Sequence, residues 1–252
     1  MNNALAIRRT ELVFAFPDLP PEFDGYRLLH LTDLHLRYFP GLTERIAELV
    51  AATEAELCVM TGDYRPHWRM PMPPVIDDLK SVVGAVRAPD GICAVLGNHD
   101  PAALAEPLAA MGVAMLVNGD HEIARGTSVL RFVGIDDRRY HRTREGRAAL
   151  AARRGDGAFS IGLIHSPRYA IDAANAGIRL YLCGHTHAGQ VCLPGRIALY
   201  RPRECWTRMG GAWRVGEMQG YTSAGAGVSM LPVRFNCPGE IARITLRRRA
   251  PS

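Results

Sequence analysis

Aspartate, asparagine and histidine residues stand at five places along this chain, each time directly after a short apolar run. The most informative place is Gly184-His185-Thr186-His187, which follows the run 180–183. Imidazole nitrogens and carboxylate oxygens together suit Mn²⁺, Fe, Zn²⁺ or Co²⁺ better than Ca²⁺, so the pattern indicates transition-metal chemistry. The other four places are Asp33-Leu34-His35 after 28–31, Gly62-Asp63 after 57–60, Gly97-Asn98-His99-Asp100 after 92–96, and His165 after 161–164.

Each apolar run predicts a buried strand whose carboxyl end carries the polar residues. In an open α/β sheet, side chains at the ends of neighbouring strands gather into one site. Amphipathic patterns between the runs predict helices, the first of them over 43–53 with Thr43 as its N-cap. From about His121 the pattern changes to a hairpin around Arg125-Gly126-Thr127, which indicates antiparallel pairing. Parallel βαβ units followed by antiparallel strands fit two packed mixed sheets with helices outside.

Taken in order, the motifs D-x-H, G-D, G-N-H-D, H and G-H-x-H run complete from residue 33 to residue 187. This series resembles that of the calcineurin-like metallophosphoesterases. The segments 222–227, 231–234 and 238–241 look like the C-terminal end of the bacterial YkuE/YaeI-like branch of that family. The resemblance covers nearly the whole chain and implies a four-layer α/β/β/α sandwich of two mixed β-sheets flanked by helices. We expect one metallophosphoesterase domain over residues 1–252.

The resemblance also implies a metal-dependent phosphoesterase with a dinuclear metal centre. A metal-bridging hydroxide would attack a phosphodiester, pyrophosphate or phosphomonoester bond, and two divalent or trivalent transition-metal ions (Mn, Fe or Zn) would be the cofactors. Asp63 would bridge them, because the two oxygens of a carboxylate can reach two cations and offset part of their repulsion. The ligands that carry over fall into two sets: Asp33, His35, Asp63 and His187 for one metal, and Asp63, Asn98, His165 and His185 for the other.

His99 and Asp100, beside the ligand Asn98, are the predicted catalytic residues. As an imidazolium, His99 would stabilise the phosphoryl oxygens or protonate the leaving group. Asp100 would fix the orientation of the ring and favour its charged form. Three residues are predicted to contact the substrate: Arg65 and His67 in the loop after Asp63, and Arg168, which stands where relatives often carry an acidic residue after H-x-P.

The walls around the centre would set its selectivity. We expect these walls to be the loop 64–74, the segment around Arg168 and the stretch 222–231. Arginines there would bind a second phosphate or another negative group. Four apolar side chains would accept an acyl chain: Met70, Met72, Met230 and Leu231.

The composition, with 48% hydrophobic and 22% charged residues, is that of a globular protein. The net charge of +5 favours anionic substrates without indicating nucleic acid, and the arginine run 247–249 predicts a solvated terminus. No run reaches the ~18 apolar residues of a membrane-spanning helix, and the first residues lack the apolar stretch of a signal peptide. We therefore expect a cytoplasmic protein that acts on a small-molecule or lipid-linked phosphate, which leaves peripheral contact with a membrane open.

The six cysteines include no C-x-x-C pair. Three of them lie inside the apolar runs, where a thiol behaves as a small hydrophobe, so we expect reduced, structural cysteines. The sequence leaves open whether Cys192, Cys205 and Cys237 interact, and also leaves open the substrate, the native metal pair and the oligomeric state.

Two other functions stand as alternatives. A non-catalytic metal-binding scaffold of the same fold would be expected to lose ligands or His99, and this chain keeps all of them. A nuclease would need a basic stripe with interleaved aromatic residues, for which Tyr64, Arg65, Trp68 and Arg69 are too few.

Overall fold

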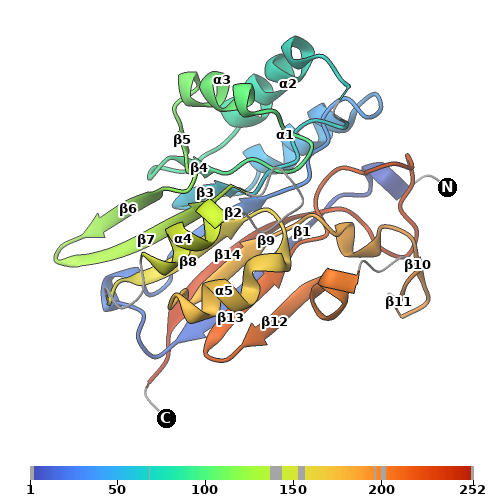
Figure 1. Ribbon diagram of the computed structural model, residues 1–252. Coiled ribbons are helices and arrows are strands. Elements are labelled where there is room, and N and C mark those ends of the chain that lie inside the picture. Colours follow the sequence, from blue (N-terminus) through green and yellow to red (C-terminus); the bar gives the residue numbers. More distant parts are fainter. Residues whose placement is uncertain are drawn as a thin grey trace.

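Two mixed β-sheets stack face to face at the centre of the molecule (Figure 1). The computed structural model describes residues 3–67, 69–136, 144–152, 157–195, 197–199 and 203–250, so Trp68 lies outside the described residues. In spatial order the first sheet consists of β1 (Arg8–Phe16), β14 (Glu240–Arg248), β2 (Arg27–Leu31), β3 (Leu57–Met60), β4 (Ile92–Ala94) and β5 (Val113–Met115). The second consists of β12 (Gly211–Val215), β13 (Met218–Thr222), β9 (Leu180–Cys183), β8 (Phe159–Ile164), β7 (Ser128–Ile135) and β6 (Asp120–Arg125).

The strands that precede the predicted ligands are parallel within each sheet. In the first sheet β2, β3 and β4 run parallel, with Leu31 opposite Met60 and Met60 opposite Ala94. In the second sheet β8 and β9 run parallel, with Leu163 opposite Leu182. Each sheet therefore carries the carboxyl ends of these strands at a single edge.

Alternation along the strands divides the core into layers. In β2, Leu28 packs between the two sheets, whereas Leu29 and Leu31 pack on the opposite face under helices. In β9, Leu182 faces the other sheet, and Cys183 faces the outer helices. Both faces of these strands are buried, which explains why their sequences are mostly apolar, with the buried His30 of β2 as an exception.

Helices cover both outer faces of the stacked sheets (Figure 1). This arrangement confirms the predicted α/β/β/α fold class. On the first sheet lie α1 (Leu42–Ala51), α2 (Met72–Gly84) and α3 (Ala105–Ala110), and on the second lie α4 (Arg144–Ala151) and α5 (Ala170–Asn175). Short 3-10 helices at 3–5, 21–23, 102–104, 167–169, 187–189 and 203–208, and the strands β10 (Cys192–Leu193) and β11 (Ile197–Ala198), complete the described elements.

The predicted N-cap of the first helix is wrong. α1 follows Gly41, whose φ of 83° lies in the left-handed region. Thr43 lies inside the helix, and its hydroxyl donates a hydrogen bond to Asp78 Oδ2 at 2.8 Å, so it joins α1 to α2 instead. The predicted hairpin is confirmed, because β6 pairs antiparallel with β7.

The structure also bears on the sequence expectations for the end of the chain and for the cysteines. Arg247 and Arg248 continue β14, so the arginine run begins as the end of a strand. All six cysteines are buried thiols, and Cys192 and Cys237 pack in one small apolar cluster with Ala198 and Ala224. Among the residues that the structure describes, no helix is both long and apolar enough to cross a membrane.

Candidate metal centre

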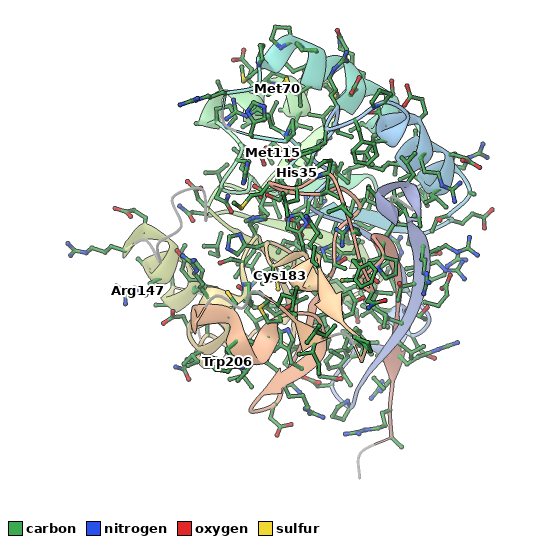
Figure 2. The ribbon with its side chains drawn as sticks, turned by 90° about the vertical axis from the view of Figure 1, so that its right-hand side faces the viewer. His35, Met70, Met115, Arg147, Cys183 and Trp206 are labelled. Atoms are coloured by element: carbon green, nitrogen blue, oxygen red, sulfur yellow. The ribbon has the colours of Figure 1, made fainter. Side chains whose placement is uncertain are left out.

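The two sheets bring their ligand-bearing strand ends to one place. Two short distances join residues from different sheets: His35 Nε2 lies 3.2 Å from His187 Nε2, and His165 Nε2 lies 3.0 Å from Asn98 Oδ1. Figure 2 shows His35 near the middle of the molecule, between Met115 and Cys183. The first sheet supplies Asp33, His35, Asp63 and Asn98, and the second sheet supplies His165, His185 and His187.

The backbone at these strand ends is turned into the left-handed region. The φ angle is 49° at Asp33, 41° at His35, 56° at Asp63, 72° at His185 and 51° at His187. Aspartate and histidine adopt this conformation more readily than most residues that have a Cβ, yet it costs roughly 1–2 kcal/mol at each position. Such strain collects at functional sites and persists because the surrounding packing holds it.

Asp33, His35 and His187 form the first group of residues that could hold a metal ion. All three residues are buried, and their ligand atoms lie within 4.8 Å of one another. Asp33 Oδ1 is 3.4 Å from His187 Nε2 and 4.0 Å from His35 Nε2. The other oxygen, Oδ2, accepts hydrogen bonds from the Thr32 hydroxyl and the His185 amide, which orients the carboxylate.

Asp63, His165 and His185 form the second group, again within 4.8 Å of one another. His165 Nε2 lies 3.3 Å from Asp63 Oδ2 and 3.2 Å from His185 Nδ1. Asp63 also borders the first group, because the same oxygen lies 3.8 Å from His35 Nε2. One carboxylate therefore stands between two sets of donors.

Hydrogen bonds on the far side of two rings fix which nitrogen faces the centre. His35 Nδ1 lies 3.0 Å from the carbonyl oxygen of Arg65, and His165 Nδ1 lies 2.8 Å from that of Thr61. A carbonyl only accepts, so each Nδ1 carries the ring proton and each Nε2 offers its lone pair to a cation.

Burial keeps His35 and His185 in the neutral form that binds metals. It lowers the pKa of His35 to about 4 and that of His185 to about 3. Burial also raises the pKa of Asp33 to about 6, with Asp63 adding to the effect and His165 opposing it. Burial acts on Asp63 in the same sense, but the neighbouring histidines outweigh it and hold the pKa of Asp63 below its usual range.

The motif glycines provide room for these side chains. A Cβ on Gly184, just before His185, would overlap Asp33 Oδ2 and the side chain of Thr32. A Cβ on Gly97 would overlap the carboxylate of Asp63. Because the donors are imidazole nitrogens, carboxylate oxygens and the amide oxygen of Asn98, the set fits transition-metal ions well.

His99 lies at the margin of the same cluster. Its Nε2 is 3.9 Å from Asp63 Oδ2, and its ring stands perpendicular to that of His35 with the centroids 5.1 Å apart. Its backbone amide donates to Asp63 Oδ1 at 2.8 Å, so this residue also orients the bordering carboxylate. Burial lowers the pKa of His99, an effect that the Asp63 carboxylate opposes.

Asp100 has a different set of partners from those expected. Its carboxylate accepts hydrogen bonds from the backbone amides of Asp63, Tyr64 and Gly97 at 2.8, 3.0 and 2.9 Å. Within the described part of the chain, these hydrogen bonds do not involve the His99 ring. Asp100 therefore shapes the two ligand-bearing loops, and its pKa is raised to about 7 by burial and by the charge of Asp63.

The three predicted substrate residues lie in different surroundings. Arg65 is buried, and its guanidinium donates to the carbonyl oxygens of His99 and Met70. His67 is exposed in the loop that follows. Arg168 is half-buried, and its charge acts on the ring of His185, which places it near the second group.

The four apolar side chains predicted to line the substrate site also lie in different surroundings. Met70 and Met72 pack against the core beneath α1–α3, whereas Met230 and Leu231 are exposed. A cavity of about 670 Å³ is lined in part by Arg8, Ala188 and Glu240, and none of the seven predicted ligands lines it.

Arg234 is a site residue to which the sequence pattern assigned no role. It is fully buried, and its Nη2 lies 3.4 Å from His187 Nδ1. In the sequence, Arg234 is a single arginine in the segment 231–234, and that segment contributed only to the family resemblance.

Known proteins resemble this chain in sequence and in fold. Residues 26–189 match the family model described as calcineurin-like phosphoesterase. The uncharacterized metallophosphoesterase YkuE of Bacillus subtilis (strain 168) is 28% identical over 253 residues, which cover 96% of this chain and 86% of that protein. Phosphodiesterase YaeI of Escherichia coli (strain K12) is 27% identical over 238 residues, which cover 88% and 82%. The solved structure of Haemophilus influenzae NAD nucleotidase (NadN) has a TM-score of 0.56 at 12% identity over 81% of this chain and 46% of that one, a likeness of the fold.

Proposed function

This chain belongs to the calcineurin-like phosphoesterase family, and we propose that it is a dinuclear metal-dependent phosphohydrolase, with residues 1–252 acting as one domain. One ion would be held by Asp33, His35, Asp63 and His187, and the other by Asp63, Asn98, His165 and His185. The observation that carries the proposal is the position of Asp63 Oδ2, 3.8 Å from His35 Nε2 in one group and 3.3 Å from His165 Nε2 in the other.

When bound, the two metal ions would supply positive charge that binds a phosphate group and lowers the pKa of water. The protein's part is to hold the donors in place. The carbonyls of Arg65 and Thr61 orient His35 and His165, and the backbone amide of His99 orients Asp63. Burial lowers the pKa of His35 and of His185, so no proton has to leave either of these two rings before an ion enters.

His99 would act on the leaving oxygen or on the phosphoryl oxygens. Its side chain is 19% exposed, so the ring borders both the donor cluster and solvent. Nδ1 of this ring has no hydrogen-bond partner among the described residues. Even a neutral imidazole carries one N–H, which would serve as the donor to the substrate.

The preferred substrate would be a phosphodiester or a pyrophosphate with a bulky, partly apolar substituent. Met230 and Leu231 are 89% and 56% exposed. The side chain of Gln190, which lies three residues after His187, donates a hydrogen bond to the carbonyl of Leu231. Arg168, close to His185, would bind a second negative group. The relative YaeI is named a phosphodiesterase, which supports the diester option.

A metal-supplemented screen of the purified full chain tests the proposal. Protein loaded with Mn²⁺, Fe²⁺ or Zn²⁺ is assayed with a bis-aryl phosphodiester, a nucleotide diphosphate conjugate, an aryl phosphomonoester and a phosphopeptide. We expect turnover that needs metal, stops with a chelator and is absent in Asp63→Asn. Two bound ions per chain without turnover of any substrate would instead support the non-catalytic scaffold.

A further inference from the structure

The segment 232–240 takes no part in the chemistry proposed above, yet it contains the largest fully buried side chain of the described residues, Arg234. We propose that Arg234 is a positioning residue for the first metal group, Asp33, His35 and His187. This inference rests on the proposed two-metal function.

The guanidinium of Arg234 is surrounded by carbonyl oxygens. Nη2 donates to Ala224 and Gly227, each at 2.6 Å, and to Gly225 at 3.1 Å, while Nε donates to Gly227 at 3.0 Å. Nη1 lies 3.4 Å from the carbonyl of Cys237. A buried cation without a contacting carboxylate is costly unless its donors are satisfied, so these carbonyls are needed to keep it in place.

Three of the carbonyls bound by Arg234, those of Ala224, Gly225 and Gly227, belong to the loop that supports Asp33. In this loop, residues 224–227, the amide of Gly227 donates to the carbonyl of Asp33 at 2.7 Å and the amide of Ala226 donates to that of Thr32 at 3.2 Å. Gly225, with φ of 73°, passes so close to Asp33 that an added Cβ would lie 2.6 Å from the Asp33 Cβ. Arg234 therefore holds the surface against which Asp33 rests.

The same guanidinium contacts the other side of the first group. Nη1 lies 3.5 Å from the carbonyl oxygen of His187, and Nη2 lies 3.4 Å from its Nδ1. Arg234 thus contacts both the main chain and the ring of His187, while His187 Nε2 faces Asp33 Oδ1 at 3.4 Å. One side chain links two ligands that lie 154 positions apart (187 − 33).

Two members of the second group, His165 and Asp63, depend on other anchors, whereas the amide of His185 donates to Asp33 Oδ2. His165 is held by the carbonyl of Thr61, and Asp63 by the amide of His99 and by the Asp100 carboxylate on its backbone. Loss of the guanidinium should therefore weaken one metal site of the two.

The test measures metal binding as well as activity. Arg234→Met keeps the apolar stem and removes every donor, and Arg234→Lys keeps the charge with fewer donors. The matched control is Tyr181→Phe, which removes a buried hydrogen bond to the Ser166 carbonyl, next to His165. Zn²⁺ and Co²⁺ are titrated into each protein, ions per chain are counted by elemental analysis, and His35→Ala and His165→Ala provide references for loss of the first and second sites.

We expect wild type to bind two ions and Arg234→Met to bind one of them roughly 10–100-fold more weakly, as measured when the supports of metal ligands are removed. Its Co²⁺ absorption spectrum should match that of His35→Ala, and Arg234→Lys should recover part of the lost affinity. Two ions bound with wild-type affinity in Arg234→Met, or equal weakening of both sites, would overturn the inference. If Arg234→Met does not fold, the same criteria are applied to Arg234→Lys. A wild type that fails to bind two ions would instead refute the proposed function.

Discussion

Asp63 is the residue on which both halves of the proposed centre depend. Its carboxylate lies beside His35 in one group and His165 in the other, and its second oxygen accepts the amide of His99. An amide in its place would keep the shape and one acceptor oxygen but lose the negative charge.

Asp63→Asn should therefore lower metal content and abolish activity while leaving the fold intact. Elemental analysis, a circular dichroism spectrum and a rate measurement check the three parts. Asp77→Asn, at a carboxylate that is 69% exposed on α2, is the matched control and should behave as wild type. Two ions per chain in an active Asp63→Asn protein would refute the assignment.

His99 differs from the ligands in that its loss should leave the ions in place. Because it would act on oxygens that gain charge in the transition state, His99→Ala should lower kcat by roughly 10²–10⁴-fold with unchanged metal content. A diester with a good leaving group should be affected less, since protonation then matters less. His121→Ala, on β6, serves as the control, and wild-type turnover in His99→Ala would mean that the ring is structural.

At the scale of elements, the strands follow from the sequence, but the turns after them do not. Continuous apolar runs predict buried strands because β2, β3 and β9 are covered on both faces. The left-handed backbone conformations at Asp33 and His185 give no periodic pattern in the sequence, because they depend on packing against glycines and neighbouring loops. For the same reason Thr43 resembles an N-cap in sequence, although its hydroxyl bonds to the next helix.

Glu240, the first residue of β14, fastens the other end of the loop that Arg234 holds. It accepts hydrogen bonds from the hydroxyls of Thr10, Tyr221 and Ser223 and from the amide of Ala224. Burial alone would raise the pKa of Glu240, but these hydrogen bonds outweigh it, so the folded-state pKa lies below the ordinary value.

Glu240→Gln should lower the free energy of unfolding by roughly 1–3 kcal/mol at neutral pH, as expected for hydrogen bonds to a charged group. A depressed pKa stabilises the fold fully above the unfolded-state value of about 4.3, and this contribution is lost as the pH falls through the folded-state pKa. Urea denaturation between pH 7 and pH 3 should thus show the gap between wild type and Glu240→Gln closing in acid. The charge of Glu240 also acts on Arg234 and His30, so the urea denaturation series is repeated with the His30→Gln protein. A gap independent of pH would contradict the assignment.

At the scale of the whole molecule, the centre exists because two sheets end at the same place. The apolar runs predict the strands and the family resemblance supplies the four-layer stacking, and together they predict which residues the structure brings near one another. Surface character was less predictable. Met72 and Met230 are the same residue type, but one packs against the core and the other is 89% exposed, and only the tertiary arrangement distinguishes them.

The exposed apolar side chains continue away from the centre. Leu193 and Ile197 pair across β10 and β11 and are 49% and 50% exposed, while their neighbours Cys192 and Ala198 are buried on the other face. Phe235, 55% exposed, adjoins Val191 beside this hairpin. In the proposed function, apolar surface of this kind would suit a substrate that is anionic at one end and apolar at the other.

The last prediction concerns that selectivity. Bis-aryl phosphodiesters or nucleotide diphosphate conjugates should exceed phosphopeptides in kcat/KM, because a phosphopeptide would need an open, shallow site.

Arg168→Ala should narrow this difference in kcat/KM between diesters and phosphopeptides by removing a charge close to His185. Arg65→Ala should also narrow this difference, and because the Arg65 guanidinium holds the carbonyl of His99, it should in addition lower kcat for every substrate. Replacement of Met230 and Leu231 by serine should weaken diesters with long apolar substituents and spare short ones. Val13→Ser, on β1 and 66% exposed, controls for the loss of an apolar surface residue. Efficient phosphopeptide turnover with diesters untouched under every metal would show that these walls serve another class of substrate.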